Sequence, residues 1–148
     1  MKRKTINFCL SVLFCAFVMM LSINLFNPLN NVSLAQDTGK VYELRIYTAT
    51  PGNIGNLQAR FRDHTLRIFE KHGMTNIAYW SPTDPEQAQN TLIYVLSHEN
   101  RDAADASWRA FGQDPEWQAV SEASNANGPI LANVERTWMR TLDFSPMQ

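Results

Sequence analysis

The sequence VYELRIYT at residues 41–48 sets the first constraint on the fold. Large apolar and polar side chains alternate along it, and a period of two residues predicts a β-strand. The Pro51-Gly52 pair follows almost directly and predicts the turn that ends this strand. We therefore expect the folded domain to begin with a strand near Val41.

The remaining elements follow from helical and strand periods further along the chain. Apolar residues recur at helical spacing over 53–72, and Gly73 is placed to end that helix. Asn100 and Asp114 are helix-capping residues, and Asp114 is followed by proline and glutamate, the preferred order at a helix start. The predicted strands are 41–48, 74–80, 91–98 and 130–142, and the predicted helices are 53–72, 100–111 and 114–124.

This β-α-β-β-α-β order, with its second helix in two pieces, predicts an α+β fold of the ferredoxin-like kind. Such a unit builds one antiparallel sheet with helices on a single face. We expect Leu44 and Ile46 to face the helices, which leaves Glu43, Arg45 and Tyr47 on the uncovered face. Bulky groups of the other strands join them there, and a large exposed apolar patch usually marks an interface. We predict a homodimer whose two sheets face one another.

The first 35 residues have the three parts of a secretory signal peptide. Three basic residues at 2–4 precede an apolar run over 6–26, and Ser33-Leu34-Ala35 offers small residues for cleavage after Ala35. Residues 36–148 then form a single domain that is exported, periplasmic or secreted. An uncleaved anchor is the alternative, because the apolar run approaches the ~20 residues that span a bilayer. Both cysteines lie in the leader, so the mature domain has no disulfide or cysteine metal site.

The charge balance argues against nucleic acid and, after leader cleavage, against a membrane surface as partners. Three of the 13 lysines and arginines lie in the leader, so the domain carries 10 basic residues against 14 acidic ones. Phosphate binding needs a basic stripe, which this balance does not favour. The sequence also has no glycine-rich phosphate loop, nucleophile elbow, zinc helix or calcium loop, which removes most hydrolases, kinases and nucleotide enzymes.

Several motifs follow one another along the chain: Tyr42–Tyr47 with Pro51-Gly52, Arg62–His64 through Lys71–Gly73, Tyr94–His98, and Ser107–Phe111 leading into Asp114–Trp117. In this order and spacing they resemble the NIPSNAP family, a branch of the dimeric α/β-barrel superfamily. The resemblance covers residues 41–144 and implies a β-α-β-β-α-β unit that dimerises through its sheet. It implies no assigned reaction, although the wider superfamily includes cofactor-independent monooxygenases, haem-degrading enzymes and chlorite dismutases. The exported leader departs from the eukaryotic members, so their mitochondrial and vesicle roles are not carried over.

His64 and His98 are the histidines of greatest chemical interest. His64 lies at the edge of the apolar stripe of helix 53–72, where it either faces a pocket as a haem ligand, metal ligand or general base, or fixes the helix on the core. His98 either turns with Tyr94 into the barrel, to meet Arg45 and Tyr47 in a polar pocket, or only ends its strand. His72 lies in the last turn of helix 53–72, where the helix dipole alone favours a basic side chain.

Two neighbouring groups of residues receive structural interpretations. Glu43 and Arg45 are spaced for an ion pair with a neighbouring strand or the partner subunit, which more often fixes register than catalyses. The aromatic residues Trp108, Phe111 and Trp117 are predicted to form a core cluster under the split helix.

The sequence thus predicts a small hydrophobic or aromatic ligand in an α/β-barrel pocket, with chemistry of the monooxygenase kind if there is a reaction. Candidate catalytic residues are His64, His98 and Arg45. No metal and no cofactor are expected, and haem held by His64 is the alternative. A non-enzymatic homodimeric interaction module is the competing function. The predicted pocket is lined by Arg45, Tyr47, His64, Tyr94 and His98.

Overall fold

The computed structural model describes residues 39–147, and the predicted leader lies outside the described residues. Its elements follow the predicted order and bounds within a few residues, with one addition, a short helix at residues 85–88. The strands are β1 (Val41–Ala49), β2 (Thr75–Trp80), β3 (Thr91–His98) and β4 (Leu131–Met139). The helices are α2 (Ile54–Arg60), the π-helical turn η2 (Phe61–Thr65), α3 (Leu66–Lys71), α4 (Pro85–Ala88), α5 (Arg101–Gln113) and α6 (Pro115–Ser124).

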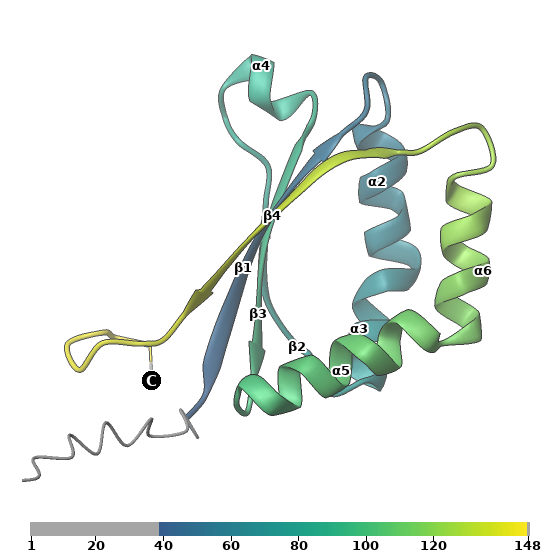
Figure 1. Ribbon diagram of the computed structural model, residues 1–148. Coiled ribbons are helices and arrows are strands. Elements are labelled where there is room, and N and C mark those ends of the chain that lie inside the picture. The colour runs from purple at the N-terminus through teal and green to yellow at the C-terminus, as the bar shows by residue number, and fades with distance from the viewer. Residues whose placement is uncertain (1–38, 148) are drawn as a thin grey trace, which may run out of the picture. The chain divides into compact units, whose positions relative to one another are not determined.

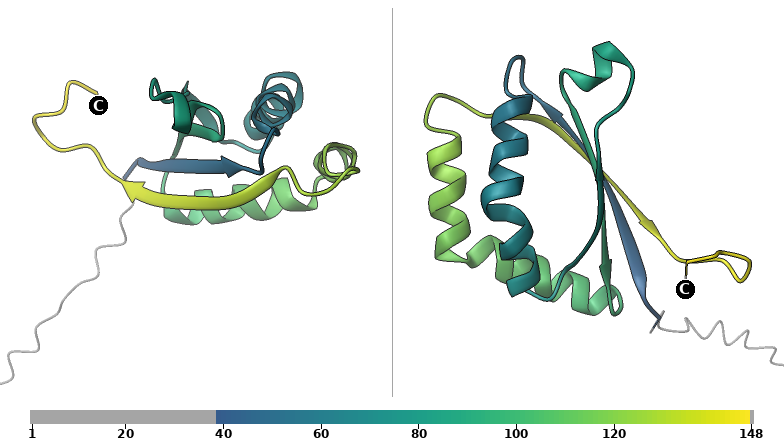
Figure 2. Two further views of the ribbon diagram at one scale, coloured as in Figure 1. Left: turned by 90° about the horizontal axis from the view of Figure 1, so that it is seen from above. Right: turned by 180° about the vertical axis from the view of Figure 1, so that it is seen from behind.

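The four strands form one antiparallel sheet in the order β2-β3-β1-β4, which confirms the ferredoxin-like α+β prediction. Helices α2, α3, α5 and α6 lie on one side of this sheet and leave its other side without helices (Figures 1 and 2). Among residues 39–147, no helix is long and apolar enough to cross a bilayer.

The prediction of which face of the first strand meets the helices was wrong. Tyr47 belongs to the core cluster with Leu57 and Phe61 of the long helix, so Glu43, Arg45 and Tyr47 face the helices. Leu44 and Ile46 face the uncovered side. Alternation fixes which residues share a face of a strand, but it does not say which face the helices cover. Here the edge-to-face packing of Tyr47 with Phe61 and Tyr94 places the Tyr47 face of β1 toward the helices.

A π-helical turn interrupts the long first helix. The backbone N–H of Leu66 donates to the carbonyl of Phe61, and the Thr65 hydroxyl donates to the carbonyl of Arg60 at 3.1 Å. A π-turn holds one residue more than an α-turn, so it rotates the side chains that follow it. Thr65 takes the buried position after Phe61, and His64 is left exposed to solvent.

The predicted helix caps are confirmed. The Asn100 side chain accepts from the backbone N–H of Ala103 at 2.8 Å, and Asp114 accepts from that of Glu116 at 2.8 Å. Asp114 has extended backbone angles, so α5 ends there and α6 starts with Pro115. The break that divides the second helix therefore falls at Asp114.

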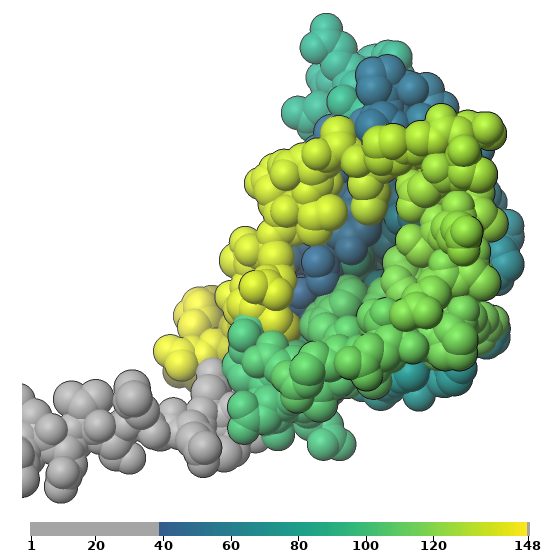
Figure 3. All heavy atoms as spheres, turned by 45° about the vertical axis from the view of Figure 1, so that its right-hand side comes forward, coloured from purple at the N-terminus to yellow at the C-terminus, as the bar shows by residue number. Residues whose placement is uncertain are grey.

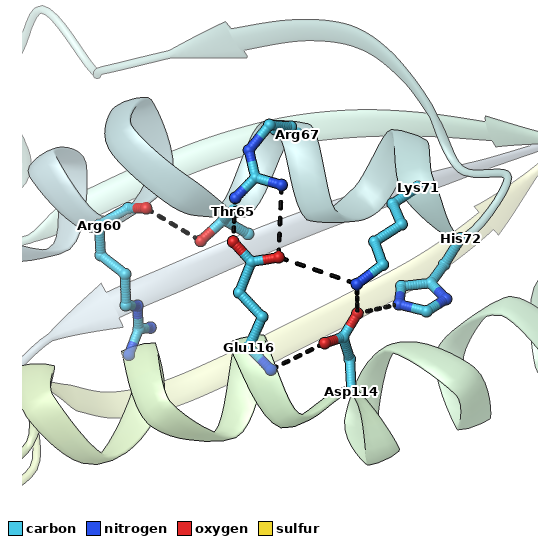
Figure 4. A network of polar contacts seen from close by, with 7 residues as sticks. All are labelled: Arg60, Thr65, Arg67, Lys71, His72, Asp114 and Glu116. Carbon is cyan, nitrogen blue, oxygen red and sulfur yellow. Dashed lines mark hydrogen bonds and ion pairs between the residues drawn. The ribbon is translucent and has the colours of Figure 1, made fainter.

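Asp114 also joins α6 to the end of the first helix (Figure 4). Its Oδ2 lies 2.7 Å from Lys71 Nζ and 2.6 Å from His72 Nε2, and Glu116 pairs with Arg67 beside it. Hydrogen bonds from Lys71 and then His72 hold the pKa of the Asp114 carboxyl well below its usual range. His72 thus has a specific partner in addition to the helix dipole.

We expect Asp114→Ala to lower the melting temperature by about 5 °C or more at pH 7, because it removes a helix cap and the hydrogen-bond partner of Lys71 and His72. The folded-state pKa of Asp114 is depressed, so its contribution to stability is present above the unfolded pKa near 4 and disappears as the pH falls through the folded value. Thermal unfolding of both proteins at pH 7 and pH 3 should show a smaller difference at pH 3. The exposed variant Glu122→Gln serves as control, and a difference that grows toward low pH would contradict the assignment.

Candidate functional site

Glu43 is the buried centre of the site. Glu43 is the third residue of β1, and although it is a charged residue its side chain has no solvent exposure. One carboxylate oxygen accepts from Arg45 Nη1 at 3.1 Å. The other accepts from Trp108 Nε1 at 2.6 Å and lies 3.2 Å from His98 Nε2. Burial of a carboxylate is tolerated only when donors replace its water, and these three residues provide them.

Arg45 connects this centre to the aromatic residues around it. Its guanidinium lies 4.1 Å from the ring centroid of Trp108 and 5.5 Å from that of Tyr47, while the same group pairs with Glu43. The expected ion pair is therefore formed between two residues of one strand rather than across strands. Arg136 of β4 is the cross-strand neighbour of Arg45, so a second cation enters this part of the sheet.

His98 forms a carboxylate–histidine pair with Glu43. An ionised Glu43 can only accept, so Nε2 of His98 donates to it, and Nδ1 is the atom left over. This Nδ1 is buried and has no hydrogen-bond partner. The Trp138 ring packs beside the imidazole, with the ring centroids 5.7 Å apart. A carboxylate that fixes the tautomer of a histidine is the arrangement used to orient a general base.

Three buried nitrogen atoms around Glu43 lack a hydrogen-bond partner: Arg45 Nε, His98 Nδ1 and Trp138 Nε1. Buried polar atoms are almost always paired in folded proteins, so such a group needs an explanation. The molecular surface is hollowed between β4 and the α5–α6 pair, with β1 at the bottom of the hollow (Figure 3). Arg45 lies on β1 and Trp138 on β4, so two of these nitrogen atoms belong to the strands beside this hollow.

Tyr47 and Tyr94 form the apolar side of the site. Their ring centroids are 5.2 Å apart, and Tyr94 also stacks on Tyr79 at 5.3 Å. Tyr94 is completely buried, and this burial raises the pKa of its phenol well above the ordinary value, with a further increase from Tyr47. Four of the five predicted pocket residues, Arg45, Tyr47, Tyr94 and His98, thus lie on the helix-facing side of two paired strands.

His64, the fifth predicted residue, lies elsewhere. It is exposed on η2 and lines a groove against α6, because the π-turn directs it away from the sheet. The expected place under the long helix was therefore wrong. Residues 39–147 contain no group of three or more histidine, cysteine, aspartate or glutamate side chains that could hold a metal ion. Haem binding through His64 gains no support, and the expectation of no cofactor stays a prediction.

The sequence interpretation missed the hydrogen bonds that hold the site together. Trp108 and Trp117 pack against the core cluster that contains Phe111, as predicted, but Trp108 also donates to Glu43. Trp138 was not singled out at all. One signal was present in the sequence: Glu43 and Arg45 share the strand face that carries Tyr47, an aromatic residue suited to the core.

Comparison with known proteins agrees with this fold. The family model described as NIPSNAP matches residues 42–146. The chain belongs to the NIPSNAP family. The matched range includes β2, β3 and β4, all but the first residue of β1, every helix of the described residues and the Glu43 site. NIPSNAP proteins lie in the dimeric α/β-barrel superfamily, and the family has no assigned function.

Solved NIPSNAP structures share the fold at low sequence identity. A NIPSNAP-like domain protein from Burkholderia xenovorans is 18% identical with a TM-score of 0.63, and the alignment covers 74% of this chain and 90% of that one. A NIPSNAP family protein of unknown function from Agrobacterium tumefaciens is 18% identical with a TM-score of 0.64, and the alignment covers 75% of this chain and 96% of that one. A second NIPSNAP family protein from Agrobacterium tumefaciens is 18% identical with a TM-score of 0.64, and the alignment covers 74% of this chain and 99% of that one. No curated protein matches the chain.

Proposed function

We propose that this NIPSNAP protein binds a small phenolic or otherwise aromatic, weakly acidic molecule on the helix side of its sheet, beside Arg45 and His98. The observation that carries the proposal is the set of buried nitrogen atoms without partners around Glu43. The oxygen of a phenol would accept from Arg45 Nε, and its hydroxyl would donate to His98 Nδ1. The aromatic rings of Tyr47 and Trp108, which already pack against the Arg45 guanidinium, suit an aromatic ligand.

The enzymatic form of the proposal is a proton transfer. A neutral His98 that donates through Nε2 to Glu43 has its lone pair on Nδ1, which accepts the proton of a phenol. The products are a phenolate and an imidazolium, and the Glu43 carboxylate offsets the positive charge on His98. Arg45 stabilises the phenolate. Removal of this proton is also the first requirement of cofactor-independent oxygenation, the reaction class that the superfamily resemblance suggests.

The test uses 4-nitrophenol, whose phenolate absorbs visible light. We expect the wild-type protein to bind it and to lower the pKa of the bound phenol. Arg45→Met should weaken binding at least 10-fold, about 1.4 kcal/mol, because a charge-assisted hydrogen bond to the phenolate is lost. His98→Gln should leave binding within a few-fold but abolish the pKa change.

Arg140→Met, an exposed change outside the site, is the control and should bind as the wild type does. If Arg45→Met and His98→Gln only reduce thermal stability and the probe still binds with its pKa lowered, both residues are structural and the proposal fails. A non-enzymatic interaction module is favoured if the wild-type protein shows no binding. Haem would appear as a visible band in the purified protein before any probe is added.

We also propose that the protein is exported and forms a homodimer through the uncovered face of its sheet. Three large apolar side chains of the strands are exposed on that face: Ile77, Trp80 and Met139. They share a pocket of about 400 Å³ with the C-terminal segment 140–147. Native mass spectrometry of the protein from an exporting bacterial host tests both proposals, since the mass shows the number of chains and whether residues 1–35 have been removed.

A further inference from the structure

We propose a second site, which binds a small monocarboxylate in the groove between the first helix and α6. The groove has a volume of about 580 Å³. Asn56, Ala59, Arg60, Asp63 and His64 line one wall, and Ala119, Val120, Ala123, Ser124 and Asn127 line the other. None of these residues takes part in the Glu43 site, so this proposal is independent of the proposed function.

Arg60 is the central observation. Its side chain points from α2 toward α6 (Figure 4) and is 6% exposed. Its Nη1 donates to the Ser124 hydroxyl at 3.1 Å, and its guanidinium lies 5.3 Å from the ring centroid of Trp117. Its Nε is buried without a hydrogen-bond partner, and no carboxylate in residues 39–147 forms an ion pair with it.

A buried cation without an anion is unfavourable, and burial accordingly lowers the pKa of Arg60. Two other basic residues of this helix pair with carboxylates: Arg67 with Glu116, and Lys71 with Asp114 and Glu116. Arg62 forms no ion pair with the described residues, but it is exposed to water, whereas Arg60 is buried. Asp63 is close in sequence but exposed, and it makes no hydrogen bond or ion pair with the described residues. The fold therefore leaves Arg60 without an internal anion at a point where it borders a groove.

The chemistry of the walls selects the anion. A carboxylate is planar and matches the donor geometry of a guanidinium. Ala59, Ala119 and Ala123 leave space beside Arg60 and offer an apolar surface to a short hydrocarbon chain. The negative charge of Asp63 at the rim disfavours a doubly charged anion such as phosphate. The π-turn brings Asp63 and His64 to this rim, and π-turns often occur at functional sites.

The test is an NMR titration of the wild-type protein with butyrate at constant ionic strength, observing the Nε–H signal of Arg60. We expect saturable shifts at millimolar butyrate, and at least 10-fold weaker shifts with phosphate. Asp63→Asn should tighten butyrate binding about 3-fold and reduce the preference over phosphate, because a nearby like charge is removed. Arg60→Met should abolish saturation at the Ser124 amide, whereas the exposed Arg62→Met should not.

The proposal is overturned if the Arg60 signal does not move at about 50 mM butyrate. This concentration is well above the expected millimolar Kd, which corresponds to a binding free energy of about −4 kcal/mol. It is also overturned if chloride or phosphate moves the signal as butyrate does. If Arg60→Met does not fold, the wild-type and Asp63→Asn titrations still decide the question. Failure here leaves the 4-nitrophenol experiment unaffected, since that experiment reports on Arg45 and His98.

Discussion

Glu43→Ala should lower the free energy of unfolding by about 3–5 kcal/mol, because it leaves buried donors without their acceptor. Arg45, His98 and Trp108 all bond to this carboxylate, and the alanine would also leave a cavity between β1 and α5. For a domain of this size such a loss corresponds to a fall of roughly 10 °C or more in the melting temperature. Chemical denaturation of the two proteins, monitored by tryptophan fluorescence, measures it.

Two further variants separate charge from packing. Glu43→Gln keeps the volume and one acceptor, so we expect it to be less destabilising than alanine but to abolish the pKa change of bound 4-nitrophenol. Glu99→Ala removes an exposed carboxylate next to His98 in the sequence and should change stability by no more than about 0.5 kcal/mol. A Glu43→Ala protein as stable as the Glu99→Ala protein would mean that the buried hydrogen bonds contribute nothing to the fold.

Trp80→Glu should convert the proposed dimer into a monomer. Trp80 is 50% exposed on β2, and a glutamate there would have to be buried without a cation when two uncovered sheet faces pack together. Burial of an unpaired charge costs several kcal/mol. We therefore expect the dimer dissociation constant to rise at least 100-fold, about 2.7 kcal/mol. Sedimentation of the purified domain over a range of concentrations measures this change.

The matched control is Gln118→Glu, which adds the same single charge to an exposed position of α6 on the helix side. It should leave the dimer intact. Circular dichroism shows whether Trp80→Glu still folds, and Ile77→Glu on the same strand serves as a second variant if it does not. A wild-type domain that sediments as a monomer at all concentrations would refute the dimer.

The order of elements could be predicted because it depends on local signals. Alternation at residues 41–48, the helical spacing over 53–72, and the caps at Asn100 and Asp114 are properties of short segments, and the structure confirms each of them. The antiparallel order β2-β3-β1-β4 then follows from the β-α-β-β-α-β pattern. Tyr94 and His98 were placed together with Arg45 and Tyr47 because their spacing along two strands is a backbone property.

The candidate site itself depended on tertiary structure. Which face of β1 meets the helices is decided by packing of Tyr47 against Phe61, and the sequence interpretation chose the opposite face. The π-turn moved His64 out of the predicted pocket, since one extra residue in a turn changes the direction of every side chain near it. Local sequence alone determined the strands, helices and caps of this protein. Only the packed structure decided that Glu43 is buried with Trp108 and His98. His98 is 55 positions from Glu43 and comes beside it when β1 pairs with β3, and Trp108 is 65 positions away and reaches it when α5 packs on the sheet.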